Sequence, residues 1–322
     1  MTAKRKIERR KGTPRAWVAR YMRLPLSIAI IACSLAHADE TESVSPQTRF
    51  SSKEMGLRLR VQDGGWAGAP RESIETVLYS VADELLSRLP TKLASTIVII
   101  HTDSNPVAMY ERGPAGEYQI RLHASGENWH LYAYEFAHEL CHILSNYDEN
   151  IDATTIKHNQ WFEETLCETA SLFVLKSLAN TWESSPPEPK WSEAARKLRR
   201  FFDHLISESH RQLPAQTPLV SWLHENEDRL RNDPYMRNNN EVVANLLLPL
   251  FQEDPQNWAS LNYLNLDPSD ARDSLEDYLH HWYQNAPLQH KHFIAGVLAM
   301  FNLNMTLPST APSSIDKLSS VQ

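Results

Sequence analysis

Residues 138–142 read His-Glu-Leu-Cys-His, and the rest of the chain can be interpreted outward from this stretch. In a helix, residues four apart lie on one face, so His138 and His142 can direct both imidazoles at a single point. Two imidazoles at this spacing suit a zinc ion, and Glu139 lies where it can take a proton from a metal-activated water. Residues 128–144 contain no Gly or Pro, which favours a helix.

A second stretch, residues 161–170, begins 19 residues beyond His142 and also has a helical pattern. It carries three carboxylates, at Glu163, Glu164 and Glu168. Glu164 and Glu168 are four apart and share a face, so one can bind the metal while the other orients a ligand imidazole. Glu163 points about 100° away from Glu164 around a helix, so both cannot serve as ligands.

An HExxH motif followed some twenty residues later by a Trp-x-x-Glu helix resembles the gluzincin metallopeptidases, the group that contains thermolysin and aminopeptidases with a downstream Glu ligand. The resemblance covers residues 95–180 and implies a zincin-like fold, Zn²⁺ as the cofactor and hydrolysis of peptide bonds. Glu139 would be the general base, and Glu168 would accept a hydrogen bond from a ligand imidazole, His138. The zinc ligands that the resemblance implies are His138, His142 and Glu164.

Two departures from the family concern the substrate. The aminopeptidases usually follow the ligand Glu with Gly, whereas this chain has Thr165, and we find no exopeptidase-type Gly-rich motif.

In gluzincins a Tyr or His from downstream of the ligand Glu helix stabilises the oxyanion that forms during hydrolysis. Tyr235 lies in a turn-like segment before an apolar helix and is our choice for this catalytic donor, with His224 as the alternative. A Tyr that only packs is the other interpretation of Tyr235.

The start of the chain has the pattern of an export signal over residues 1–38. Residues 1–23 carry nine Lys or Arg and one Glu, and an apolar run too short for a transmembrane helix then leads to an Ala-x-Ala sequence ending at Ala38. Residues 30–33 also resemble a lipoprotein signal, in which a lipid on Cys33 would anchor the protein. We therefore predict a periplasmic or secreted protein, with a lipid anchor if Cys33 is modified. An uncleaved membrane anchor and a misassigned start codon are the other interpretations.

Without residues 1–38 the chain is acidic. Lys and Arg fall from 32 to 23 and Asp and Glu from 40 to 39, which leaves a net charge near −16. Nucleic-acid binding needs a basic face, so we exclude nucleic acid as a partner and expect a peptide or protein substrate.

Alternating and apolar patterns predict strands at residues 57–61, 96–100 and 116–124, and a helix at residues 71–89 that Pro90 ends. The strand at 116–124 directly precedes the metal-binding helix. In zincins the strand at this position is a sheet edge with which an extended substrate pairs. An ordinary half-buried strand is the other interpretation.

These patterns indicate an α+β fold with a zincin-like mixed sheet, an active-site helix and a mainly helical C-terminal subdomain. A Pro-containing linker at residues 180–190 precedes the helical part. Further helices are predicted at residues 191–211, 241–251, 270–285 and 290–301. The resulting divisions are an export signal (1–38), a catalytic half (39–182), a helical half (183–305) and a disordered tail (306–322).

The cysteines and the remaining histidines are weaker indicators of function than the residues above. Cys141 and Cys167 each follow a predicted ligand by three residues, so we expect them to be near one another, as a disulfide or as two free thiols. His130 is expected at the surface. The pairs 280–281 and 290/292 are expected in solvent, with a second metal cluster as the alternative.

The sequence thus predicts an exported zinc metallopeptidase. The alternatives are a non-catalytic envelope protein that zinc stabilises, and a lipoprotein that acts as a binding module. Glu139 discriminates between catalysis and a structural site, because a purely structural zinc site has no need of a general base.

Overall fold

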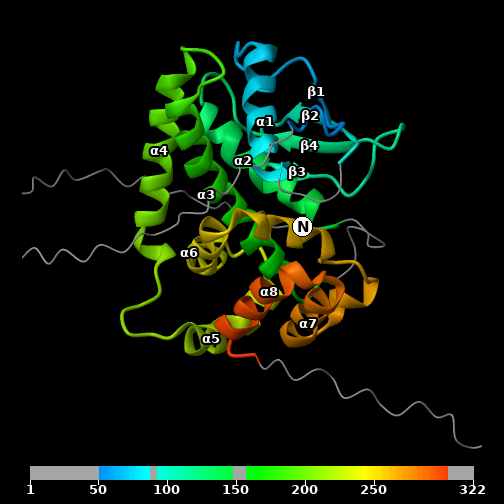
Figure 1. Cartoon of the computed structure of the whole chain (residues 1–322), viewed down its shortest axis with the longest axis vertical. Helices are drawn as coiled ribbons and strands as arrows, with labels where there is room; N and C mark the ends of the chain where they lie inside the picture. The colour runs from blue at the N-terminus through cyan, green and yellow to red at the C-terminus, as the bar shows by residue number, and fades with distance from the viewer. Residues whose placement is uncertain (1–50, 88–92, 148–156, 304–322) are drawn as a thin grey trace, which may run out of the picture. The chain divides into compact units, whose positions relative to one another are not determined.

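The computed structural model describes residues 51–87, 93–147 and 157–303 (Figure 1). The predicted export signal with Cys33 and the predicted tail at 306–322 lie outside these ranges. Among the described helices, none combines the length and the apolar character needed to cross a membrane.

Four strands form one mixed sheet in the order β1-β2-β4-β3. Their bounds are β1 Arg58–Val61, β2 Thr96–His101, β3 Val107–Ala108 and β4 Tyr118–Leu122. β1, β2 and β4 are parallel neighbours, whereas β3 is antiparallel to β4 and pairs Val107 with Arg121. The prediction that the strand before the metal-binding helix is a sheet edge is therefore wrong, because β3 covers that side of β4. Two residues are too few to show a strand pattern in the sequence.

The helices account for most of the described chain, so the fold is α+β, as predicted. They are α1 Arg71–Leu86, α2 Trp129–Leu144, α3 Gln160–Ser184, α4 Trp191–Ser207, α5 Leu219–Asn232, α6 Arg237–Glu253, α7 Leu275–Asn285 and α8 Leu288–Met300. Three 3-10 helices, η1 Ser209–Arg211, η2 Pro255–Tyr263 and η3 Pro268–Arg272, connect them.

Several helical boundaries and one whole helix differ from the prediction: α6 begins four residues earlier than predicted, and the segment predicted as a helix from residue 270 forms η3 followed by α7. α3 continues to Ser184 into the predicted linker, because Trp182 is buried and its ring lies 5.0 Å from that of Trp191. The helix predicted to reach Arg211 ends four residues earlier, and η1 follows after a break at residue 208. α5 was not predicted, because most of its residues are polar or charged and only three are buried.

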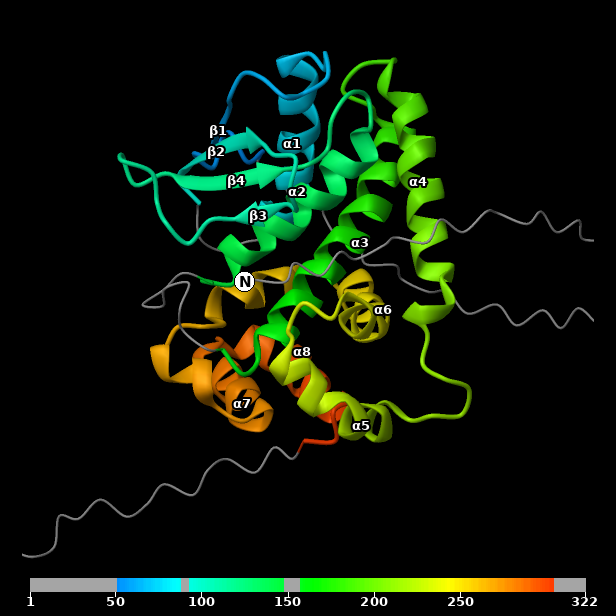
Figure 2. The same cartoon turned by 180° about the vertical axis from the view of Figure 1, so that it is seen from behind.

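α3 is the central helix of the described fold (Figures 1 and 2). It packs against α2, α4 and α6 and is buried on nearly all sides, as expected for a helix without a polar face. A single hydrophobic cluster extends from Met55 to Phe301. The core therefore continues from the sheet side into the helical part of the chain.

Replacing Phe162 near the start of α3 tests this continuity. Phe162 is fully buried, and its ring contacts those of Tyr278, Trp282 and Phe301 at centroid distances of 6.3, 6.3 and 5.9 Å. Phe162→Ala should lower the free energy of unfolding by about 3–5 kcal/mol in urea titrations. Leu288→Ala is the control, because Leu288 is 85% exposed, and should change it by less than about 0.5 kcal/mol. A small effect of Phe162→Ala would contradict a shared core.

Candidate metal centre

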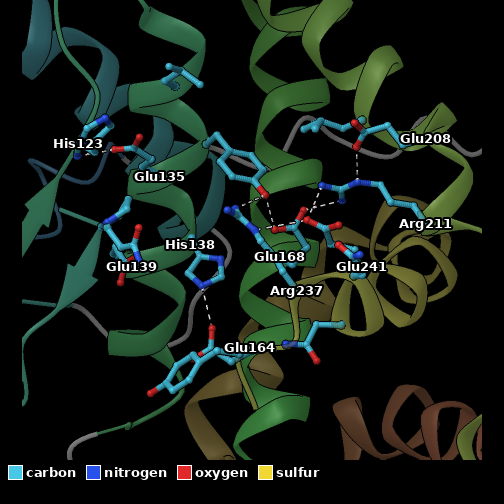
Figure 3. Close-up of a pocket in the computed structure, with 18 of the residues that line it drawn as sticks. His123, Glu135, His138, Glu139, Glu164, Glu168, Glu208, Arg211, Arg237 and Glu241 are labelled. Carbon is cyan, nitrogen blue, oxygen red and sulfur yellow. Dashed lines mark hydrogen bonds and ion pairs between the residues drawn. The ribbon is translucent and has the colours of Figure 1, made fainter. Parts of the chain in front are cut away.

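α2 and α3 bring the predicted ligands to one point (Figure 3). Glu164 Oε2 lies 3.1 Å from His138 Nε2, and Glu164 Oε1 lies 3.7 Å from His142 Nε2. The two helices are joined beside the site by a hydrogen bond from the Ser171 hydroxyl to the Tyr134 carbonyl, at 2.9 Å. One carboxylate thus faces both imidazoles.

These distances suit a zinc ion. Zinc bonds of about 2.0–2.2 Å to nitrogen and oxygen place the ligand atoms of a tetrahedral site about 3.4 Å apart. The two observed distances between Glu164 and the imidazoles lie on either side of this value. The two distances run to different oxygens of Glu164, so this carboxylate lies near both imidazoles at separations similar to those of zinc ligands.

Glu163 fixes the orientation of His142. Its Oε1 lies 2.8 Å from His142 Nδ1, and its Oε2 contacts Asn265 Nδ2 at 3.2 Å and Lys157 Nζ at 3.8 Å. Burial alone would raise the pKa of Glu163, but Lys157 and the hydrogen bond from His142 lower it below its usual value. The ionised carboxylate can only accept, so His142 Nδ1 carries a proton and Nε2 can turn a lone pair to a metal.

Glu168 does not take the role predicted for it. It is buried, and its carboxylate accepts hydrogen bonds from the Tyr134 hydroxyl and from Arg211 Nη1, the latter at 2.7 Å. A guanidinium–carboxylate bond is stronger than one from a neutral imidazole, which explains the difference. Within the described ranges, His138 Nδ1 is buried without a hydrogen-bond partner. The carboxylate that orients a ligand imidazole is Glu163 instead.

Glu139 lies beside the ligands and contacts the sheet. Its Oε2 accepts a hydrogen bond of 2.7 Å from the Ala108 N–H of β3. Burial raises the pKa of Glu139, although His138 and His142 oppose this shift. A carboxylate with a raised pKa accepts a proton more readily near neutral pH, which suits a general base.

The site opens into a cavity of about 930 Å³. Figure 3 shows His123, Glu135 and Glu139 on one side of His138, and Arg211, Arg237 and Glu241 on the other. The remaining lining residues include Asp103, Ser104, Asn105, Pro106, Leu131, Tyr134, Glu164, Glu168, Phe201, Leu205, Glu208, His210, Tyr235, Asn238 and Asn240. The predicted ligand Glu164 and the predicted base Glu139 therefore border a space large enough for a ligand.

The two residues predicted as oxyanion donors lie in different places. Tyr235 lines the cavity, is 66% exposed, and its hydroxyl accepts a 2.8 Å hydrogen bond from Gln160 Nε2. Its catalytic role stays a prediction. His224 is exposed on α5 and is not among the lining residues. The histidine that does line this side is His210, whose Nε2 lies 2.7 Å from Glu241 Oε2.

Cys141 and Cys167 are buried neighbours with free thiols rather than a disulfide. Burial raises the pKa of Cys167, and its contact with Cys141 adds to the shift. Cys167 is also a second candidate for the third ligand, because ligand atoms of His138, His142 and Cys167 lie within 4.8 Å of one another. Unlike Glu164, Cys167 is not among the residues that line the cavity.

The other histidines give no second histidine cluster among the described residues. His281 instead meets two carboxylates, with Nδ1 at 2.7 Å from Asp270 Oδ1 and 3.1 Å from Asp273 Oδ2. His280 and His290 are both buried, contrary to prediction, and His290 packs near Tyr263. His130 is partly buried against Phe201, with ring centroids 4.9 Å apart.

Several site residues were missed in the sequence. Tyr134 precedes His138 by four and so shares its helix face, a signal that was available. Arg211 and Arg237 lie 43 and 69 residues after Glu168, and no local pattern connects residues so far apart.

Comparison of the chain with protein-family models, with curated proteins and with solved structures finds no match.

Zinc affinity should depend on pH through His142. Burial lowers the pKa of His142, but Glu164 and Glu163 outweigh it and raise the pKa to about 10. The metal-free protein then holds a proton that zinc must displace, so affinity should fall about tenfold per pH unit below 10. Calorimetry at pH 7.5 in buffers of different ionisation enthalpy should show about one proton released per zinc. Affinity constant between pH 7 and 9 would contradict this.

Proposed function

We propose that this chain is an exported zinc-dependent peptidase of the gluzincin type. The observation that supports it most is that Glu164 lies near both His138 and His142, and that His138, Glu164 and Glu139 line a cavity. Export is proposed from the basic and apolar pattern of residues 1–38. A fold with a small mixed sheet, an antiparallel edge strand and α2 beside it is compatible with the zincin-like architecture.

Each residue has a role in this proposal. His138, His142 and Glu164 would hold the zinc, which supplies Lewis acidity that polarises a carbonyl and acidifies water. Glu139 takes a proton from the attacking water on its carboxylate, which the Ala108 N–H holds in position.

The substrate would be an extended peptide. β3 is the edge of the sheet, and its neighbour Pro106 lines the cavity. The Ala108 N–H points to Glu139 rather than to β4, so this side of β3 faces the site. An extended peptide can lie along this edge and cross the site beside Glu139, while the Ala108 N–H stays bonded to Glu139.

The competing function is a zinc-stabilised protein without catalysis. The proximity of Cys167 to both histidines favours it, since two His and a buried Cys could hold a zinc away from the cavity. The two functions predict different ligands, which can be tested directly.

Zinc content of two variants separates these functions. Glu164→Ala should lose most zinc after dialysis, because it removes the carboxylate that faces both imidazoles. Cys167→Ala should keep about one zinc per chain, because the thiol would not be a ligand. Metal analysis after circular dichroism has verified folding is the measurement. If Cys167→Ala lost zinc and Glu164→Ala kept it, the result would contradict the peptidase and support the structural site.

The base is tested by Glu139→Gln. The variant should keep zinc and fold but hydrolyse peptides at least about 100-fold more slowly, because the amide cannot accept the proton. Turnover is measured on a pool of internally quenched peptides. Glu127→Gln, at an exposed position before α2, is the control and should keep wild-type turnover. Undiminished turnover in Glu139→Gln would rule out the mechanism.

A further inference from the structure

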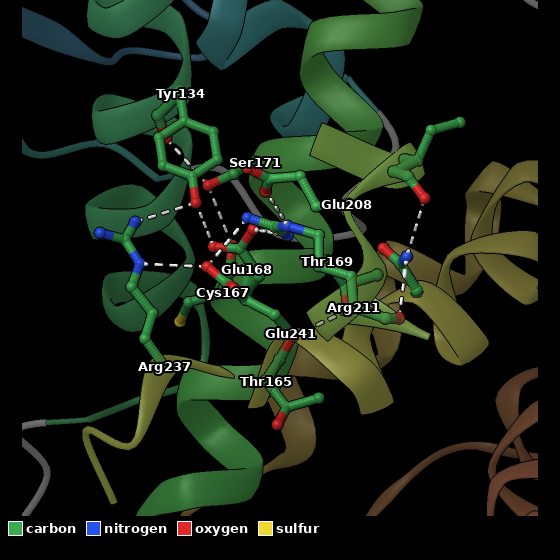
Figure 4. Close-up of polar contacts among 12 residues, drawn as sticks. Tyr134, Thr165, Cys167, Glu168, Thr169, Ser171, Glu208, Arg211, Arg237 and Glu241 are labelled. Atoms are coloured by element: carbon green, nitrogen blue, oxygen red, sulfur yellow. Dashed lines mark hydrogen bonds and ion pairs between the residues drawn. The ribbon is translucent and has the colours of Figure 1, made fainter. Parts of the chain in front are cut away.

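Two arginines lie on the same side of the cavity but are used differently (Figure 4). The Arg211 side chain is only 2% exposed, and its guanidinium binds three carboxylates. They are Glu168 Oε1 at 2.7 Å, Glu241 Oε1 at 2.8 Å and Glu208 Oε2 at 3.1 Å. Arg211 is therefore committed to holding η1, α3 and α6 together.

Arg237 is open to a ligand. Its side chain is 64% exposed, Nη2 donates to the Tyr134 hydroxyl at 2.9 Å, and Nε lies 3.4 Å from Glu241 Oε1. A guanidinium has five N–H donors in one plane. Over the described part of the chain, Nη1 of Arg237 has no hydrogen-bond or ion-pair partner, and the Arg237 residue lines the cavity. Arg237 thus has donors available, in the forked geometry that suits a carboxylate.

The separation of Arg237 and His138 can be estimated from their positions relative to α2. Arg237 is bonded to Tyr134, which precedes His138 by four residues on the same helix face. One helical turn is about 5.4 Å, and an extended peptide advances about 3.4 Å per residue. A group bound to Arg237 is therefore about one or two peptide residues from a carbonyl held at His138.

We propose that Arg237 binds the C-terminal carboxylate of the substrate, so that cleavage removes one or two residues from the C-terminus. This inference rests on the proposed peptidase function. It assigns the chain to carboxy-terminal exopeptidases.

The rest of the cavity is compatible with this orientation. The carboxylates nearest Arg237 are already paired: Glu168 with Arg211, and Glu241 with Arg211 and His210. On the opposite side of His138 lie the acidic side chains of Glu135 and Glu139, which do not favour a substrate carboxylate. Leu131, Phe201 and Leu205 also line the cavity and provide apolar surface for the side chain of a terminal residue.

The first test measures binding and needs no turnover. Zinc-loaded Glu139→Gln protein is titrated with an N-acetylated tetrapeptide ending in Phe, as the free acid and as the C-terminal amide. The free acid should bind about 10–100-fold more tightly, because the amide lacks the charge that pairs with Arg237. Adding Arg237→Gln should remove this preference, because it weakens binding of the free acid and not of the amide. Adding Arg229→Gln, at an exposed position of α5, should leave it intact.

The second test measures hydrolysis by the zinc-loaded wild type and by Arg237→Gln. Mass spectrometry should show loss of one or two residues from the free acid, and Arg237→Gln should raise its KM more than it lowers kcat. Equal binding of acid and amide, or a preference that survives Arg237→Gln, overturns the role of Arg237. Internal cleavage of amidated peptides at wild-type rates would keep the peptidase and overturn the exopeptidase. Acid preference in binding without cleavage of any peptide would overturn the peptidase and leave Arg237 as an anion site.

Discussion

The packing of α2 against α3 places five glutamates in one largely buried space. The rest of the site depends on which hydrogen-bond donors and cations compensate their negative charges. Glu135 and Glu139 come from α2, and Glu163, Glu164 and Glu168 from α3. An unpaired buried carboxylate is strongly destabilising, so each requires donors or a cation. On α2, Glu139 accepts a hydrogen bond from the Ala108 N–H, and Glu135 accepts hydrogen bonds from the N–H groups of His123 and Ala124. On α3, Glu163 contacts His142, Glu164 contacts His138, and Glu168 contacts Arg211.

The partners of these carboxylates come from distant segments, which explains why the two predicted halves share one core. Arg211 enters from η1, and Asn265 reaches Glu163 from the segment after η2. Glu168 and Glu163 have partners on α2, but they gain Arg211 and Asn265 only when these later segments are in place. Phe162 adds an apolar contact between α3 and these helices. The candidate metal centre and the helical part of the chain thus share contacts.

Local patterns predicted the features that depend on local geometry. The apolar period of α1, the run of β2 and the four-residue spacing of His138 and His142 all survive in the structure, because side-chain direction follows backbone period. Features that depend on long-range pairing were missed or misassigned. β3 exists only through its pairing with β4, and Glu168 was assigned to His138 because Arg211 could not be anticipated. The position of Glu163 beside His142 Nδ1 was missed for a different reason. A ring has two nitrogens, so carboxylates from different sides of α3 can reach the same histidine.

Access to the cavity, rather than affinity, favours Glu164 over Cys167 as the proposed third ligand. Thiolates bind zinc strongly, and a metal can deprotonate a thiol even where burial has raised its pKa. A zinc held by Cys167, however, would be drawn toward a fully buried residue that does not border the cavity. Glu164 borders it, and the two histidines lower its pKa against the effect of burial, so its carboxylate is ionised before a metal arrives. A zinc held by Glu164 would keep its open position next to Glu139, which gives the buried base a function that a closed site would not use.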